Sequence, residues 1–440
     1  MRCSFEGSVL KSQSWRCGYA ETDITPKPGQ AFMTGFGKER YARGTLAPLR
    51  AQAVALEDAQ GKRAVIVASD VLGYSRVFVD AMRQKVLDRY GLAADAVSFP
   101  CSHTHCGPTV NFGVTFAVGG LNVWYLAHLE DALVDLVGEA LKRLSAADVS
   151  VGEADCQVGM NRRNVKNGEI VPGPNPDGVY DRHTPILRIS RRKSPRDIVI
   201  VCHACHPTST GAYDKWSPDW PGAMRNRLES QLKDSRAVFV KGCGADANVV
   251  HKDPETGETV FSRDPHRARL AGVRMANQVL RFLAQNPLDA LEPTIRTRLV
   301  SGSLSLQKSP TRKHVREMAL NGDNSSHFTW WARQSIAYPD SRKSVDYDVQ
   351  VWLLGELKMF WLEGEVCADL GIALKQTHEG PVMTAAYTNA CPGYISSARL
   401  IREKGYEGYA SHMAYFLPAP FAQKSEKEFM ELCAKAVKGL

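Results

Sequence analysis

Short apolar runs rich in valine and alanine alternate along this chain with longer segments whose apolar residues recur every three or four positions. The runs AQAVALED (51–58) and RAVIVAS (63–69) precede an amphipathic segment at 75–91, and a second such segment spans 124–144. Short β-branched runs are typical of strands, and the longer spacing is typical of helices. This alternation predicts an α/β fold in which helices flank a mixed β-sheet core.

The same alternation continues to the C-terminus. The segment 160–183 is dense in Asn, Gly and Pro, which predicts a loop. No repeat, low-complexity linker or break in composition divides the chain, so residues 1–440 are predicted to form a single domain. Further strands are expected at 184–190, 197–207, 237–246, 294–306 and 346–366, and further helices at 264–285, 315–324, 424–440 and from Pro221.

Charge and cysteine content limit the partners and the compartment. The net charge of +8 comes without an aromatic platform or a nucleic-acid-binding motif, so no nucleic-acid partner is expected. No window reaches the ~18 apolar residues of a membrane span, so no stable membrane association is expected. The eleven scattered cysteines and the absence of a signal-peptide core predict a cytoplasmic protein, secreted or periplasmic only if a leader was trimmed. A homo-oligomer is left open.

Two histidines two residues apart stand in SHTHCGP (102–108), directly after an apolar run. Side chains of an extended segment alternate between its faces, so we expect His103 and His105 to share one face and reach into a cleft. The alternative is a polar loop that happens to contain histidine. The motif therefore gives a candidate site at a strand end.

Three more strand ends carry reactive side chains: His206 in CHACHP, Glu365 in WLEGEV and Tyr394 in NACPGY. Two histidines and a carboxylate are the usual donors of catalytic zinc, although Mn²⁺ or Fe²⁺ would accept the same set. Taken singly, His206 is equally typical of a buried core histidine, Glu365 of a helix cap and Tyr394 of a core tyrosine. Together they predict one Zn²⁺ ion held by loops at strand ends.

The order of the motifs AETDITP (20–26), MTGFG (33–37), SHTHCGP, NRR, HP, GADAN, GEV, NACPGY and YEGY resembles that of the neutral/alkaline ceramidase superfamily, in register from about residue 17 onward. SHTHCGP differs from the family string THTHSGP at Ser102 and Cys106. The resemblance implies that the zinc ligands are His103, His206, Glu365 and Tyr394. It also implies that His105 lies beside the reacting carbonyl and that Arg162 and Tyr406 line the site.

One departure from the family concerns the nucleophile. Ceramidases carry GDxSPN with a serine proposed to attack, whereas this chain reads GADANV (244–249), with Asn248 in the place of the serine. An amide cannot attack a carbonyl, so metal-bound water is the expected nucleophile. Asp246 is interpreted as a general base or, preferably, as an acceptor that orients a ligand histidine. The family's C-terminal β-sandwich is not expected, because only about 45 residues follow Tyr394.

These observations favour a zinc-dependent hydrolase that cleaves an amide or ester of a soluble, polar small molecule. The first alternative is a carbohydrate-active enzyme, a glycoside hydrolase or uronate lyase acting on an oligosaccharide; the second is a non-catalytic zinc-binding protein. Trp216 and Trp220 are expected to stack on sugar rings or simply to pack, and Arg163 suits a carboxylate or sulfate. The expected catalytic residues are His105, Arg162, Asp246 and Tyr406, and the expected substrate-binding residues are Arg163, Trp216, Trp220 and Asn248.

Overall fold

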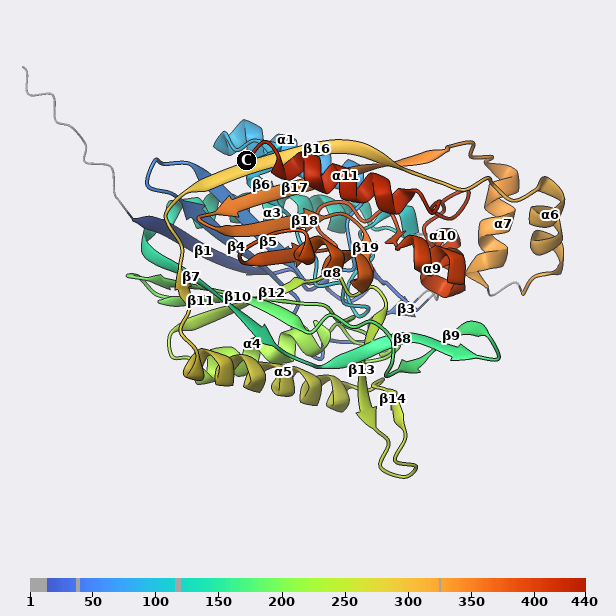
Figure 1. Cartoon of the computed structure of the whole chain (residues 1–440), viewed down its shortest axis with the longest axis horizontal. Helices are drawn as coiled ribbons and strands as arrows, with labels where there is room; N and C mark the ends of the chain where they lie inside the picture. The colour runs from blue at the N-terminus through green and yellow to red at the C-terminus, as the bar shows by residue number, and fades with distance from the viewer. Residues whose placement is uncertain (1–13, 37–39, 115–119, 324–325) are drawn as a thin grey trace, which may run out of the picture.

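The computed structural model describes residues 14–36, 40–114, 120–323 and 326–440 (Figure 1). Its largest sheet has nine strands in the order β12-β11-β10-β7-β1-β4-β5-β6, with β15 paired to β7. Two neighbouring pairs, β11 with β12 and β5 with β6, are parallel, whereas β1 and β4 are antiparallel, so the sheet is mixed as predicted. The bounds are β1 Trp15–Asp23, β4 Arg50–Glu57, β5 Arg63–Ser69, β6 Val97–Ser98, β7 Ser145–Asp155, β10 His183–Arg191, β11 Asp197–His203, β12 Ser235–Lys241 and β15 Asp289–Ala290.

A second sheet, β16-β17-β18-β20, packs against one face of the first. Ile66 of β5 and Ile200 of β11 share this buried layer with Trp352 and Trp361 of the second sheet. Val65 and Val67 point to the opposite face of β5, where helices cover them. Because both faces are buried, β5 is a continuous apolar run rather than an alternating one. The bounds are β16 Ile295–Ser305, β17 Ser344–Leu354, β18 Leu357–Leu362 and β20 Val382–Ala385.

Helices cover the outer faces of both sheets, giving a helix–sheet–sheet–helix order (Figure 1). Helix α3 packs on β1, β4 and β5 with α1 beside it, α4 packs on β12 with α5 beside it, and α11 packs on β16 and β17 of the second sheet. The predicted stop of α1 is confirmed, since Gly91 adopts a φ of 66° at its C-cap. The bounds are α1 Arg76–Tyr90, α3 Val123–Lys142, α4 Asp219–Gln231, α5 Pro265–Gln285, α6 Arg312–Asn321, α7 His327–Ala337, α8 Ala368–Gln376, α9 Ala398–Glu403, α10 Ser411–Ala414 and α11 Ser425–Val437.

The prediction of a loop at 160–183 was wrong. Strands β8 (Gly159–Lys166) and β9 (Glu169–Asn175) form a hairpin there, joined in a further sheet to β13 (Ala247–Lys252) and β14 (Thr259–Phe261). The hairpin turns at Asn167 and Gly168, with φ values of 53° and 79°. An Asn-Gly pair is the preferred sequence for such a two-residue turn, so the signal was present in VKNGEI.

Smaller differences concern element ends. Helix α4 begins at Asp219, two residues before Pro221, and α6 begins at Arg312 after the Thr311 cap rather than at 315. Helix α7 was not predicted.

The remaining short elements are β2 Phe32–Met33, β3 Arg40–Tyr41, β19 Glu365–Val366, β21 Tyr394–Ile395, the 3₁₀ turns η1 Ala94–Ala96 and η2 Phe112–Val114, and the π-helical turn η3 Tyr406–Ala410.

Ten cysteines fall in the described ranges, and all are buried free thiols. Among the helices of the described residues, none combines the length and apolar character needed to cross a membrane. The single domain over 1–440 and the cytoplasmic location stay predictions.

Candidate metal centre

Three histidine side chains converge from the loops that follow β6 and β11. His103, His105 and His206 each offer a ring nitrogen, and these atoms all lie within 4.8 Å of one another. The Nε2 atoms of His103 and His105 are 3.4 Å apart. The reason given from the sequence was wrong, because residues 102–105 do not form a strand: His103 has a φ of 65°, in the left-handed region. This turn, rather than the alternation of a strand, brings the two rings together.

Glu365 completes the cluster from β19. Its Oε2 lies 3.2 Å from His103 Nε2 and 3.1 Å from His206 Nε2. Burial alone would raise the pKa of Glu365, but the two imidazoles hold it well below its usual range, which favours the carboxylate. Burial lowers the pKa of His206 and of His105 well below the usual value, which favours neutral rings.

Backbone carbonyls determine which nitrogen faces this carboxylate. His103 Nδ1 lies 2.6 Å from the carbonyl of Leu72, and His206 Nδ1 lies 3.1 Å from that of Gly244. A carbonyl can only accept, so each Nδ1 donates, which leaves Nε2 as the ring nitrogen turned toward Glu365. Two imidazole Nε2 atoms and a carboxylate oxygen this close together are a donor set that divalent cations accept. The donor set therefore fits a divalent metal ion such as Zn²⁺.

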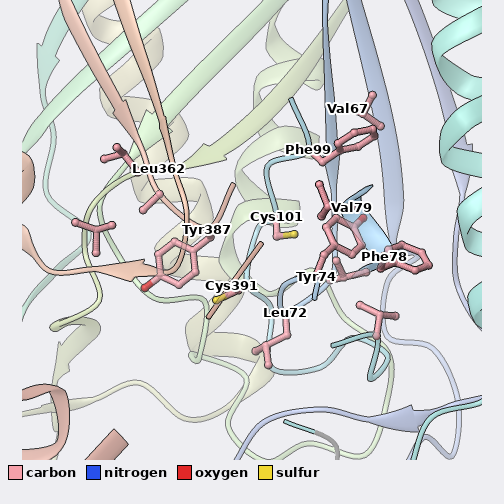
Figure 2. Close-up of a cluster of buried hydrophobic side chains, with 14 of the residues drawn as sticks. Val67, Leu72, Tyr74, Phe78, Val79, Phe99, Cys101, Leu362, Tyr387 and Cys391 are labelled. Atoms are coloured by element: carbon pink, nitrogen blue, oxygen red, sulfur yellow. The ribbon is translucent and has the colours of Figure 1, made fainter. Parts of the chain in front are cut away.

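Two tyrosines that the sequence analysis missed contact the same carboxylate. Tyr387 donates its hydroxyl to Glu365 Oε2 at 3.2 Å, and Tyr415 donates to Oε1. Tyr387 lies at the edge of the apolar cluster under the site, with its hydroxyl turned away from Cys101 and Tyr74 (Figure 2). Tyr387 stands two residues before the motif NACPGY, whereas no local signal marks Tyr415. Both hydroxyls hold Glu365 in place.

Tyr394 lies on β21, directly paired with Glu365 of β19. Its hydroxyl accepts a hydrogen bond from Arg162 Nη2 at 2.9 Å. The Tyr394 ring also contacts that of Tyr406, with centroids 5.3 Å apart. Burial raises the pKa of both tyrosines, so both hydroxyls stay protonated at neutral pH. The place of Tyr394 as the fourth metal ligand stays a prediction.

Arg162 is held on three sides. It donates from Nε to Glu407 at 2.7 Å, from Nη1 to Asn248 at 3.3 Å, and from Nη2 to Tyr394. A β-bulge between Asn161 and Arg163 shifts the register of β8, which lets the adjacent arginines reach one glutamate. Glu407, in the motif YEGY, was missed. The arrangement fixes the guanidinium beside the candidate metal ligands.

Arg163 is not free to take a substrate anion, contrary to the expectation. Its guanidinium pairs with Glu407 Oε2 at 2.8 Å and with Glu403 at 3.1 Å, and its side chain is only 4% exposed. Because two carboxylates already occupy it, Arg163 supports Glu407 and Arg162 rather than offering an open cation.

Asp246 does not orient a ligand histidine in this structure, since Leu72 and Gly244 do so. Its Oδ1 accepts the Ala368 N–H at 2.9 Å and its Oδ2 accepts from Asn161 at 3.1 Å. It therefore joins the start of α8 to β8. Burial raises the pKa of Asp246 to about 6.

Trp216 and Trp220 are both in the core, and the Trp220 indole donates to the carbonyl of His206. Their burial favours the packing interpretation, because neither ring presents an open face to a sugar.

A cavity of about 290 Å³ opens beside His105. The Nδ1 of His105 is buried and has no hydrogen-bond partner among the described residues. The cavity is lined by Phe36, His105, Arg162, Arg163, Ile170, Val171, Pro172, Thr208, Asn248, Phe261, Ser262, Arg263, His327, Tyr394, Tyr406 and Glu407. Of the residues expected to act on or bind substrate, the structure thus brings His105, Arg162, Arg163, Asn248 and Tyr406 to one cavity, together with Tyr394 from the expected metal ligands.

Comparison with solved structures finds the same fold in ceramidases. A neutral ceramidase from Pseudomonas aeruginosa matches with a TM-score of 0.76 and 16% identity, over 97% of this chain and 74% of that one. A ceramidase complexed with C2 matches with a TM-score of 0.73 and 16% identity, over 97% and 75%. No model of a protein family matches the sequence, and no curated protein matches it. The chain has a ceramidase-like fold, as the resemblance predicted.

Proposed function

We propose that this protein is a metal-dependent hydrolase, with Zn²⁺ as the expected ion, that cleaves an amide or ester of a polar small molecule. The observation that carries the proposal is the placement of the Glu365 carboxyl group between two imidazole Nε2 atoms, at 3.2 and 3.1 Å. His103, His206 and Glu365 would hold the ion, with His105 or Tyr394 as a further ligand. The fold shared with ceramidases supports a hydrolase.

When bound, such an ion would polarise a carbonyl oxygen and lower the pKa of a water molecule to about 7. The chain's own residues would bind and orient the substrate. Arg162 is a fixed cation beside the cavity, suited to stabilising negative charge on a reacting oxygen. Tyr394 already accepts from Arg162, so its own proton is free to be donated to a substrate oxygen.

Of the other residues with an expected role, some line the cavity and can contact substrate, and Asp246 holds neighbouring elements in place. His105 and Tyr406 line the cavity, where a partly exposed imidazole and a protonated phenol can bind the scissile group. Asp246 is outside the cavity lining, so we assign it a positioning role through Asn161 and α8. Asn248 accepts from Arg162 and offers no hydroxyl, which supports a route without a covalent serine intermediate.

The test is hydrolysis by metal-loaded and chelated protein, with a panel of N-acyl amino acids, N-acyl lipids, esters and uronate oligosaccharides. His206→Ala and Glu365→Gln should lose bound metal and at least about a hundredfold in activity, whereas His128→Ala, an exposed histidine on α3, should match wild type. Activity that survives both chelation and His206→Ala refutes the proposal. Metal binding without turnover of any substrate would favour the non-catalytic alternative, and an unsaturated product from a uronate would favour the lyase.

A further inference from the structure

The outer wall of the cavity is apolar. Val171 and Pro172 come from β9, and Phe261 comes from the end of β14. Phe36 lies on the other side, with its ring 5.1 Å from that of His105. Such a wall fits a compact apolar acyl group, because the volume of about 290 Å³ lies just below the ~300–1,000 Å³ of small-molecule sites.

The same cavity carries more positive than negative charge. Three guanidinium groups line it, those of Arg162, Arg163 and Arg263, against the single carboxylate of Glu407. Glu407 binds both Arg162 and Arg163, and Glu403 adds a second partner for Arg163. Arg263 is the cavity cation left without a carboxylate partner among the described residues: its side chain is exposed, and its guanidinium carbon lies 6.0 Å from the centre of the Phe261 ring.

The backbone holds Arg263 in this place. The N–H of Ser262 donates to the carbonyl of Val249 in the neighbouring strand. Gly211 packs against Arg263 so closely that an added Cβ would lie 2.7 Å from the Arg263 carbonyl oxygen. His327, at the start of α7, lines the same cavity, and its Nε2 is buried without a hydrogen-bond partner among the described residues. A cation and an unsatisfied imidazole nitrogen therefore face one small space.

We infer that the cavity selects an acidic substrate, an N-acyl or O-acyl compound whose second half carries a carboxylate that Arg263 binds, with His327 as a further hydrogen-bond partner. This inference rests on the proposed hydrolase function. It replaces Arg163, the residue expected from the sequence, by Arg263, because an unpaired guanidinium gains more from an incoming carboxylate than one already bound by two.

The test is calorimetric binding to the full-length, Zn²⁺-loaded protein. The probe is 3-benzoylpropionate, in which a methylene replaces the scissile amide nitrogen of N-benzoylglycine, compared with its neutral primary amide. Wild type should bind the acid at least about tenfold more tightly than the amide. Arg263→Gln should abolish this preference and Arg263→Lys should retain part of it. The matched control is Arg269→Gln, which removes the same charge from an exposed position on α5.

Equal affinity for acid and amide in wild type, binding of neither probe, or an unchanged preference in Arg263→Gln overturns the inference. Hydrolysis is measured separately with N-benzoylglycine and N-benzoylglycinamide. An intact binding preference with no hydrolysis of any panel substrate refutes the hydrolase and leaves the anion site standing. Hydrolysis of a panel substrate without a binding preference for the acid overturns the anion site and leaves the hydrolase standing.

Discussion

Glu407→Gln should destabilise the protein more than any other change of one charge near the cavity. Glu407 lies 2.7 Å from Arg162 Nε and 2.8 Å from Arg163 Nη1, with all three side chains largely buried. Glutamine keeps the shape but removes the charge, and its amide N–H₂ would face guanidinium N–H groups. Removing one partner of a buried ion pair costs about 3–5 kcal/mol. Glu403→Gln is the matched control, since that partly exposed partner of Arg163 is worth about 1 kcal/mol or less.

Thermal unfolding at pH 7 measures the difference. The unfolding entropy of about 2.1 cal/mol/K per residue converts that loss, for 440 residues, into a fall in Tm of about 3–5 °C, against about 1 °C for Glu403→Gln. Kinetic assays on the same variants would report a loss in kcat if Arg162 moves. Equal Tm values for the two variants would show that the buried ion pairs of Glu407 contribute no more to stability than the partly exposed pair of Glu403.

The pH dependence of this difference provides an independent check. Burial would raise the pKa of Glu407, but Arg162 and Arg163 bring it below the usual value. A depressed pKa means that the folded state favours the carboxylate, so the stabilisation is present above the ordinary glutamate pKa of about 4.3 and is lost as the pH falls further. The gap in Tm between wild type and Glu407→Gln should therefore narrow below that pH.

Three further predictions concern neighbouring features. The pKa of Asp246 is raised to about 6, so its contribution to stability should fall as the pH rises from about 4 to 6; Asp246→Asn should remove that slope from Tm against pH, and an unchanged slope would contradict the burial argument. Tyr387→Phe and Tyr415→Phe should each weaken metal affinity about tenfold in a chelator competition, with Tyr409→Phe unchanged; equal affinities would rule out their hold on Glu365. Gly168→Val should lower the free energy of unfolding by about 1–2 kcal/mol through its φ of 79°, and a neutral result would rule out the described turn.

Much of the architecture could be predicted because it follows from local patterns. The apolar run of β5 and the spacing in α1 each identify an element within a few residues, and Gly91 marks where α1 ends. The hairpin at Asn167 and Gly168 was also local, and it was missed because the composition of the flanking residues was given more weight than the turn. Helix α7 carries no such strong pattern.

For the candidate metal site, the ligands could be predicted from the sequence but the residues that hold them could not. His103, His206 and Glu365 could be selected because each follows a strand end and has the donor chemistry of a metal ligand. The partners of those side chains could not be selected, since no local feature shows which remote side chain Leu72, Gly244, Tyr387 or Tyr415 contacts.

The amino-acid sequence by itself determined the order of strands and helices and the residue types available for a metal site, because propensity, periodicity and donor chemistry are properties of short segments. Only the tertiary structure decided that Glu407 occupies both Arg162 and Arg163 and that Arg263 is left facing the cavity. Ion pairing depends on the distance between side chains from remote segments. That distance is set by how the sheets, hairpins and helices pack, and no single segment contains it.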